Sequence, residues 1–132
     1  LSGYLTLAVA LINDHPVNGE AFNFGPSANQ NHSVKDLVEE IMLAWKGTDW
    51  VDKSGYSKML SEAGLLKLCC DKALHTLNWE PTLNFSETAK WTAEWYRTYY
   101  ESGEKSAQEI TQTQIIDFMS IAKNRKSFEI YL

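Results

Sequence analysis

Apolar residues recur at helical spacing along most of this chain, whereas only two short runs alternate as β-strands do. The helical patterns cover about residues 1–12, 33–45, 70–77, 85–103 and 106–119, and the strand-like runs are residues 20–24 and 48–51. Two strands this short cannot form a large parallel sheet by themselves. The sequence therefore predicts an α/β but mostly helical fold, with about five helices and two short strands.

Local signals mark where several of these helices begin and end. Pairs spaced as capping boxes stand at Ser33 and Asp36, at Asn84 and Glu87, and at Ser106 and Glu109. Asn78 follows the third helical pattern, and asparagine tolerates the left-handed conformation that often ends a helix. We expect one domain over residues 1–132, with a separate helical tail from about residue 106.

The first helical segment is apolar nearly all round, which predicts burial on more than one side. Leu5, Leu7, Val9 and Ile12 cannot all face a core that is built by so few other elements. Large exposed apolar patches are uncommon on soluble monomers, so we expect another copy to cover the remainder. The chain is therefore predicted to form a homo-oligomer.

Composition and charge exclude several classes of partner. The chain has 132 residues and a net charge of -5, and its Lys and Arg residues are scattered, which argues against nucleic acid. It contains no apolar run of the roughly 18 residues that a membrane span requires, and no signal peptide. Cys69 and Cys70 are adjacent and are expected to be reduced thiols. These features predict a cytoplasmic protein without a membrane partner.

Residues for catalysis are difficult to find in this sequence. Its glycines form neither a dinucleotide-binding fingerprint nor a P-loop, and His15, His32 and His75 have no nucleophile or metal ligand at a useful spacing. Aromatic residues between Trp91 and Tyr100 could stack on bases or sugars, but such a stripe is more often core. The residues alone predict no catalytic, cofactor-binding or metal-binding site.

Several short motifs, taken together and in order, resemble a known family. They are LSGYL at 1–5, AFNFGP at 21–26, SVKDLV at 33–38, EA at 62–63, LKLCCDKA at 66–73, LNWEP at 77–81 and the segment 92–96. This ordered set resembles the C-terminal part of extended short-chain dehydrogenase/reductase enzymes that act on sugar nucleotides, and most closely the CDP-glucose 4,6-dehydratases. The resemblance implies the substrate-binding part of such an enzyme, without the Rossmann half that binds the dinucleotide.

The same resemblance implies what the chain can and cannot bind. The family holds NAD on an N-terminal glycine-rich turn and uses a Tyr-x-x-x-Lys pair, and this sequence contains neither. We therefore expect NAD in the complete enzyme, no cofactor in this chain, and no activity from this chain alone. The resemblance places substrate binding at Ser61, Glu62 and Lys67, with a nucleotide sugar bound weakly at most. Ser61 stands where family members usually have histidine.

A second interpretation belongs to a different functional class. The chain could be a stand-alone binding or oligomerisation module derived from such an enzyme. The tail at residues 123–132 favours this alternative, because its end is apolar and apolar ends often dock on another surface.

Overall fold

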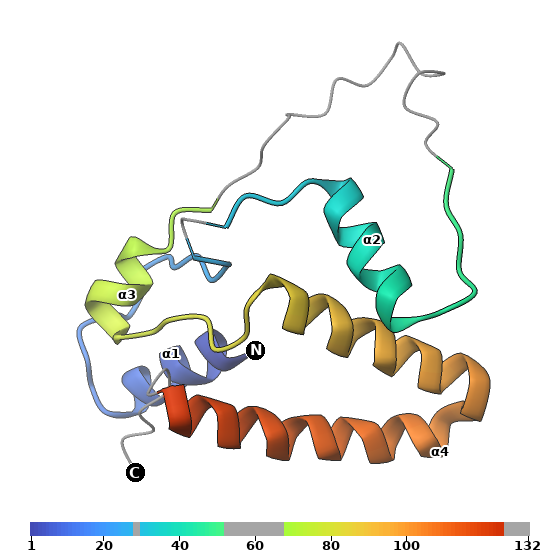
Figure 1. The fold of residues 1–132 in the computed structure, drawn as a ribbon. Helices are drawn as coiled ribbons and strands as arrows, with labels where there is room; N and C mark the ends of the chain where they lie inside the picture. Colours follow the sequence, from blue (N-terminus) through green and yellow to red (C-terminus); the bar gives the residue numbers. More distant parts are fainter. Residues whose placement is uncertain (28–29, 52–67, 126–132) are drawn as a thin grey trace.

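The computed structural model describes residues 1–27, 30–51 and 68–125. It contains the helices α1 (Ser2–Ile12), α2 (Val34–Ala44), α3 (Asp71–Leu77) and α4 (Phe85–Arg125) (Figure 1). No residue in the described ranges belongs to a strand. The mostly helical character is confirmed, but the α/β class with about five helices and two strands is wrong.

The two expected strands lack a neighbour to pair with. Residues 20–24 and 48–51 have no regular secondary structure. At Thr48, the side-chain Oγ1 donates a local hydrogen bond to the carbonyl of Trp45 at 2.8 Å. A strand needs an adjacent backbone to satisfy its donors and acceptors, which periodicity in one segment cannot supply. The alternation still has an effect, because the rings of Phe22 and Phe24 lie nearly parallel at 6.4 Å.

The last two expected helices are joined in α4, whose two helical limbs are separated by a kink at Gly103. Gly103 has φ 83° and ψ −177°, a conformation that is essentially reserved for glycine, and the second limb of α4 returns beside the first (Figure 1). The Trp95 indole donates to Thr111 Oγ1 at 2.8 Å, and the Gln114 amide donates to the carbonyl of Trp91 at 3.0 Å. The break therefore lies at Gly103, whereas Ser106, the expected cap, lies within the return limb.

Helix α2 packs on α4 through polar and aromatic contacts. The capping box at its start is present, with Asp36 N donating to Ser33 Oγ and Ser33 N donating to Asp36 Oδ2. At its other end, Arg97 of α4 donates to the carbonyl of Ala44 at 2.9 Å. The Arg97 bond and the stacking of Trp45 on Tyr100, with ring centroids 6.0 Å apart, orient α2 against the first limb of α4.

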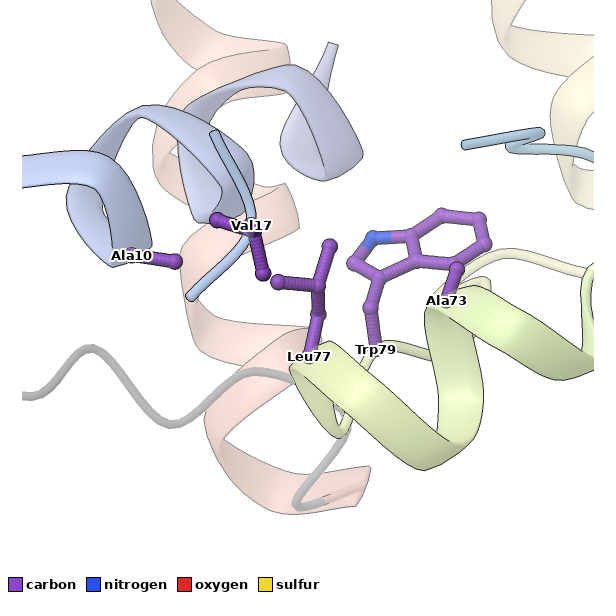
Figure 2. Packing of buried hydrophobic residues seen from close by; sticks show 5 residues of the cluster. All are labelled: Ala10, Val17, Ala73, Leu77 and Trp79. Carbon is purple, nitrogen blue, oxygen red and sulfur yellow. The ribbon is translucent and has the colours of Figure 1, made fainter. Parts of the chain in front are cut away.

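Helix α1 packs on α3 around a small core. Figure 2 shows Leu77 of α3 pointing toward Val17, with Ala10 of α1 on one side and the indole of Trp79 near Ala73 on the other. Asn78 ends α3 with φ 49°, which confirms the expected left-handed position. No large side chain among the described residues is fully buried, so this core is modest.

Only one side of α1 is buried. Gly3 and Ala10 are buried and Leu7 packs against the core, whereas an apolar row on the opposite side is exposed. We call this row the α1 stripe, and its members are Leu1, Tyr4, Leu5, Ala8, Leu11 and Ile12. The expectation of burial on more than one side is therefore wrong for the described residues, and Leu7 does not lie on the exposed side.

None of the described helices has both the length and the apolar character that crossing a bilayer requires.

Candidate functional site

The three residues expected to bind substrate, Ser61, Glu62 and Lys67, lie outside the described residues. The residues that directly follow them, Leu68 to Cys70, are described and lead into α3. These residues lie against the loop that contains the Phe-Asn-Phe-Gly motif at 22–25. The neighbourhood of the candidate site can therefore be built from that loop.

Phe24 is the centre of an aromatic cluster beside this segment. Its ring lies edge-on to Trp79, with centroids 5.0 Å apart, and edge-on to Tyr4 at 5.5 Å. It also covers Gly3, where an added Cβ would stand 2.7 Å from Phe24 Cε1 and closer still to two other ring atoms. Helix α1 therefore needs glycine at this position for Phe24 to approach.

The loop and α3 are also joined by polar contacts. Asn23 Nδ2 donates to the carbonyl of Cys69 at 3.4 Å, and Lys72 Nζ donates to Glu20 Oε2 at 2.6 Å. Lys72 lies 4.8 Å from the ring centroid of Phe22, and its hydrogen bond and charge lower the pKa of Glu20. Both partners of this ion pair are about half exposed, so the pair orients the two segments more than it stabilises the fold.

The indole of Trp79 completes the cluster. Trp79 is buried, and its Nε1 has a hydrogen-bond partner there, because it donates to Ser2 Oγ at 3.1 Å. Four of the sequence motifs thus meet in one packed unit: those at 1–5, 21–26 and 77–81, and the described part, 68–73, of the motif at 66–73. Sequence reasoning grouped these motifs by family pattern and did not predict that they touch. The alternation of Phe22 and Phe24 was the sequence signal that could have indicated these contacts.

The described residues do not contain a metal-binding cluster. No group of three or more His, Cys, Asp or Glu in those ranges could hold a metal ion. His32 stacks on Phe85, with ring centroids 3.7 Å apart, and so joins the segment before α2 to the start of α4. Its observed role is packing rather than acid–base chemistry.

The start of α1, in the described part of the chain, offers no open cradle for a phosphate. A phosphate cradle needs open backbone N–H groups at a glycine-rich helix start. Gly3 is the glycine nearest to a helix N-terminus in the described ranges, and the space above it is filled by Phe24. No step that involves NAD can therefore be assigned to these residues.

Two clefts lie on α4, away from the segment that leads into α3. One, of about 590 Å³, lies between the end of α2 and the first limb of α4 and includes the cations of Lys46, Lys90 and Arg97 beside Glu94 and Glu101. Its mixed charges do not select one ligand class.

The other cleft, of about 320 Å³, lies beside the two limbs of α4. It is lined by Trp91, Trp95, Tyr96 and Gln114 among others. Trp95 stacks on Tyr99 with centroids 5.7 Å apart and is tied to the return limb, so part of the aromatic stripe is structural, as expected. Tyr96, Tyr99 and Tyr100 are exposed.

The packed unit of four motifs makes a comparison with known proteins informative. The chain is similar to CDP-glucose 4,6-dehydratase of Salmonella typhimurium. It is 29% identical to this dehydratase over 123 residues, which cover 91% of the chain and 33% of the dehydratase. The chain thus spans about a third of the length of that relative. No family model matches the chain, and no solved structure matches it.

The similarity to the dehydratase covers 91% of the chain. It supports a distant, partial relationship to a sugar-nucleotide enzyme. The packed unit around Phe24 is built from motifs that also suggested the relationship.

Proposed function

We propose that this chain is the C-terminal, nucleotide-sugar-binding part of a CDP-glucose 4,6-dehydratase-like enzyme and is catalytically incompetent alone. NAD and the catalytic residues belong to the remainder of such an enzyme. One observation carries the proposal: four family-like motifs pack together beside the residues that follow Ser61, Glu62 and Lys67. Similarity to a named dehydratase over 91% of the chain supports it.

The contacts around Phe24 hold the segment that leads into α3 in place. Asn23, Lys72 and the Phe24–Trp79 pair hold Leu68 to Cys70 against α1 and the loop at 20–26. A segment anchored in this way fixes Leu68, the residue that directly follows Lys67 in the sequence. We propose that Lys67 binds a diphosphate oxygen there and that Glu62 and Ser61 bind hydroxyl groups.

Binding by this chain alone is proposed to be weak. Ligand sites are concave and commonly lie between domains, and one wall of such a site provides only part of the contacts and excludes little water. The clefts that the described residues form lie elsewhere, on α4. The complete enzyme would close over the nucleotide sugar.

The proposal is tested by titrating the chain with CDP-glucose and following amide chemical shifts. The shifts should move most at residues 61–67 and in Leu68 to Cys70, and Lys67→Ala should weaken binding about tenfold by removing a charge-assisted hydrogen bond. Lys46→Ala is the matched control, because Lys46 is an exposed lysine in the charged cleft of α4.

Two results would contradict the proposal. Shifts confined to Trp91 through Tyr100, or a loss of binding in Lys46→Ala alone, would place the ligand on α4. Micromolar NAD binding would show that the chain holds the cofactor by a route its glycines do not indicate.

The alternative, an oligomerisation module derived from such an enzyme, is favoured by the exposed α1 stripe.

A further inference from the structure

The two cysteines of the chain are adjacent and lie in the segment that leads into α3. Cys69 is exposed and Cys70 is half-buried, and both are free thiols. Cys69 is anchored through its backbone, because its carbonyl accepts the bond from Asn23, and its thiol has no hydrogen bond with a described residue. The pair is therefore accessible while its backbone is held in place.

The thiol of Cys70 lies beside the loop at 20–26. Its Sγ is 3.9 Å from the carbonyl oxygen of Leu68, which is a weak contact, and 3.5 Å from the position that a Cβ on Gly25 would take. Cys70 directly precedes α3, but its side chain makes no capping hydrogen bond. Neither thiol is thus held by a strong contact in the described part of the chain.

The spacing of the pair decides which ligand fits it. The Cα atoms of adjacent residues are about 3.8 Å apart across a trans peptide, which is less than the roughly 4.4 Å or more that an ordinary disulfide spans. Structural zinc is usually held by four ligands, and no group of three or more His, Cys, Asp or Glu among the described residues could hold a metal ion. The pair suits a soft atom that needs two thiolates and stands between them, because that atom enlarges the ring that the two sulfurs close.

We propose that Cys69 and Cys70 form a two-thiol site for a trivalent arsenical that carries one organic group. The arsenic of such an organoarsenic(III) oxide forms one As–S bond to each Sγ and gives up its oxygen. The two thiol protons leave with that oxygen as one water molecule, so no atom is oxidised or reduced. The organic group keeps the third position on arsenic, so no further protein ligand is needed. The inference does not depend on nucleotide-sugar binding.

Adjacency also makes the pair a better ligand than a single thiol. Once one sulfur is bonded to arsenic, the other is on the neighbouring residue, and its effective concentration is of the millimolar order that short linkers give. A thiol on another chain at micromolar concentration cannot compete with it. The two cysteines should therefore bind at least about tenfold more tightly than either one alone.

Titration of the freshly reduced full chain with phenylarsine oxide, followed by intact-mass spectrometry, tests the site. The wild type should take up one phenylarsenic group, and 2,3-dimercaptopropanol, which has two neighbouring thiols of its own, should remove it. Cys69→Ser and Cys70→Ser should each raise the dissociation constant at least about tenfold. Wild-type affinity in either variant, or no uptake by the wild type, would overturn the proposal.

A matched control keeps the number of thiols and changes only their spacing. The double variant Cys70→Ser, Ser102→Cys has its second thiol at an exposed position on α4, and it should bind as weakly as Cys70→Ser. If the double variant binds as tightly as the wild type, adjacency is not what makes the site.

Two further measurements locate the bound arsenic. Amide chemical shifts should move at Asn23 and Gly25, which lie beside the pair, and should stay unchanged at Trp95 on α4. The sedimentation coefficient should be the same with and without the arsenical. Shifts confined to α4, or a species of twice the mass that forms only with the arsenical, would contradict a site built from both cysteines of one chain.

Discussion

At the scale of single residues, Gly3 shows how a tertiary contact can reverse a local preference. Glycine inside a helix normally costs about 0.5–1 kcal/mol relative to alanine. At Gly3, however, the ring of Phe24 occupies the volume that a Cβ would need. The same ring contacts Tyr4 and Trp79, so it cannot move away without disturbing the cluster.

We therefore expect Gly3→Ala to destabilise the chain, although helix propensity alone predicts the opposite. Overpacking of this kind costs about 1–3 kcal/mol, which exceeds the propensity gain. Urea unfolding followed by tryptophan fluorescence measures the difference. Gly25→Ala is the control, because a Cβ there meets Leu68 and Cys70 at an ordinary 3.5 Å.

A second variant tests the cause of this effect. Phe24→Leu in the Gly3→Ala background should recover part of the lost stability relative to the sum of the two single changes. A Gly3→Ala chain as stable as the wild type would mean that the Phe24 ring relaxes freely, and that Gly3 is not required for its approach.

At the scale of elements, charged groups join the start of the first limb of α4 to the end of its second limb. Glu87 N donates to Asn84 Oδ1 in the capping box, and the Glu87 carboxylate accepts two bonds from Arg125 at 2.7 and 2.8 Å. Arg125 also donates to the carbonyl of Thr82. The hydrogen bonds from Arg125, and then the one from the Asn84 backbone, lower the pKa of Glu87 to about 2.

The lowered pKa of Glu87 makes the contribution of this clamp depend on pH. A carboxyl whose folded pKa is below its ordinary 4.5 stabilises the fold fully above that value, and loses the effect as pH falls through about 2. Because Glu87 is 30% and Arg125 44% exposed, we expect Glu87→Gln to cost about 1 kcal/mol at pH 7 rather than the full linkage value.

Urea unfolding of the wild type and of Glu87→Gln between pH 7 and pH 2 measures this contribution. The difference between the two curves should shrink across the lower part of that range. Glu80→Gln, an exposed carboxyl before α4, is the control and should leave the pH dependence unchanged. A constant difference at every pH would mean that the carboxylate charge of Glu87 is not what stabilises the hairpin.

At the scale of the whole molecule, the helices pack in two pairs, α1 with α3 and α2 with α4 (Figure 1). The four buried residues of α4 are all alanines, and Leu77 and Trp79 are the largest buried members of the core between α1 and α3. Such a chain buries little apolar surface, and burial is the main favourable term in folding.

We expect the melting temperature of the chain to rise with its concentration, because a dimer that forms only between folded copies stabilises the folded state by mass action. A tenfold increase should raise Tm by roughly 2–4 °C. Differential scanning calorimetry measures this shift. Leu5→Glu should melt at one temperature across the same concentrations, and Ile116→Glu should behave as the wild type. A concentration-independent wild-type Tm would contradict the prediction.

The sequence by itself determined the features that depend on neighbouring residues. The capping boxes at Ser33 and Asn84, the left-handed end of α3 at Asn78 and the helical stripes all follow from spacing within a few residues. The family-like motifs could also be recognised from the sequence, because their order along the chain is a one-dimensional property. Backbone groups near each other in sequence impose these outcomes whatever the distant parts of the chain do.

Only the tertiary structure decided which segments meet. The run at 20–24 has the alternation of a strand, but no neighbouring backbone pairs with it, and Phe24 packs on Gly3 and Trp79 instead. Gly103 ends the first limb of α4, as expected, but only the contacts of Trp95 and Gln114 across the two limbs show that the second limb returns beside the first. Likewise, Leu5 and Leu7 are both leucines on an apolar helix, and only the position of α3 decides that Leu7 packs inward while Leu5 stays exposed.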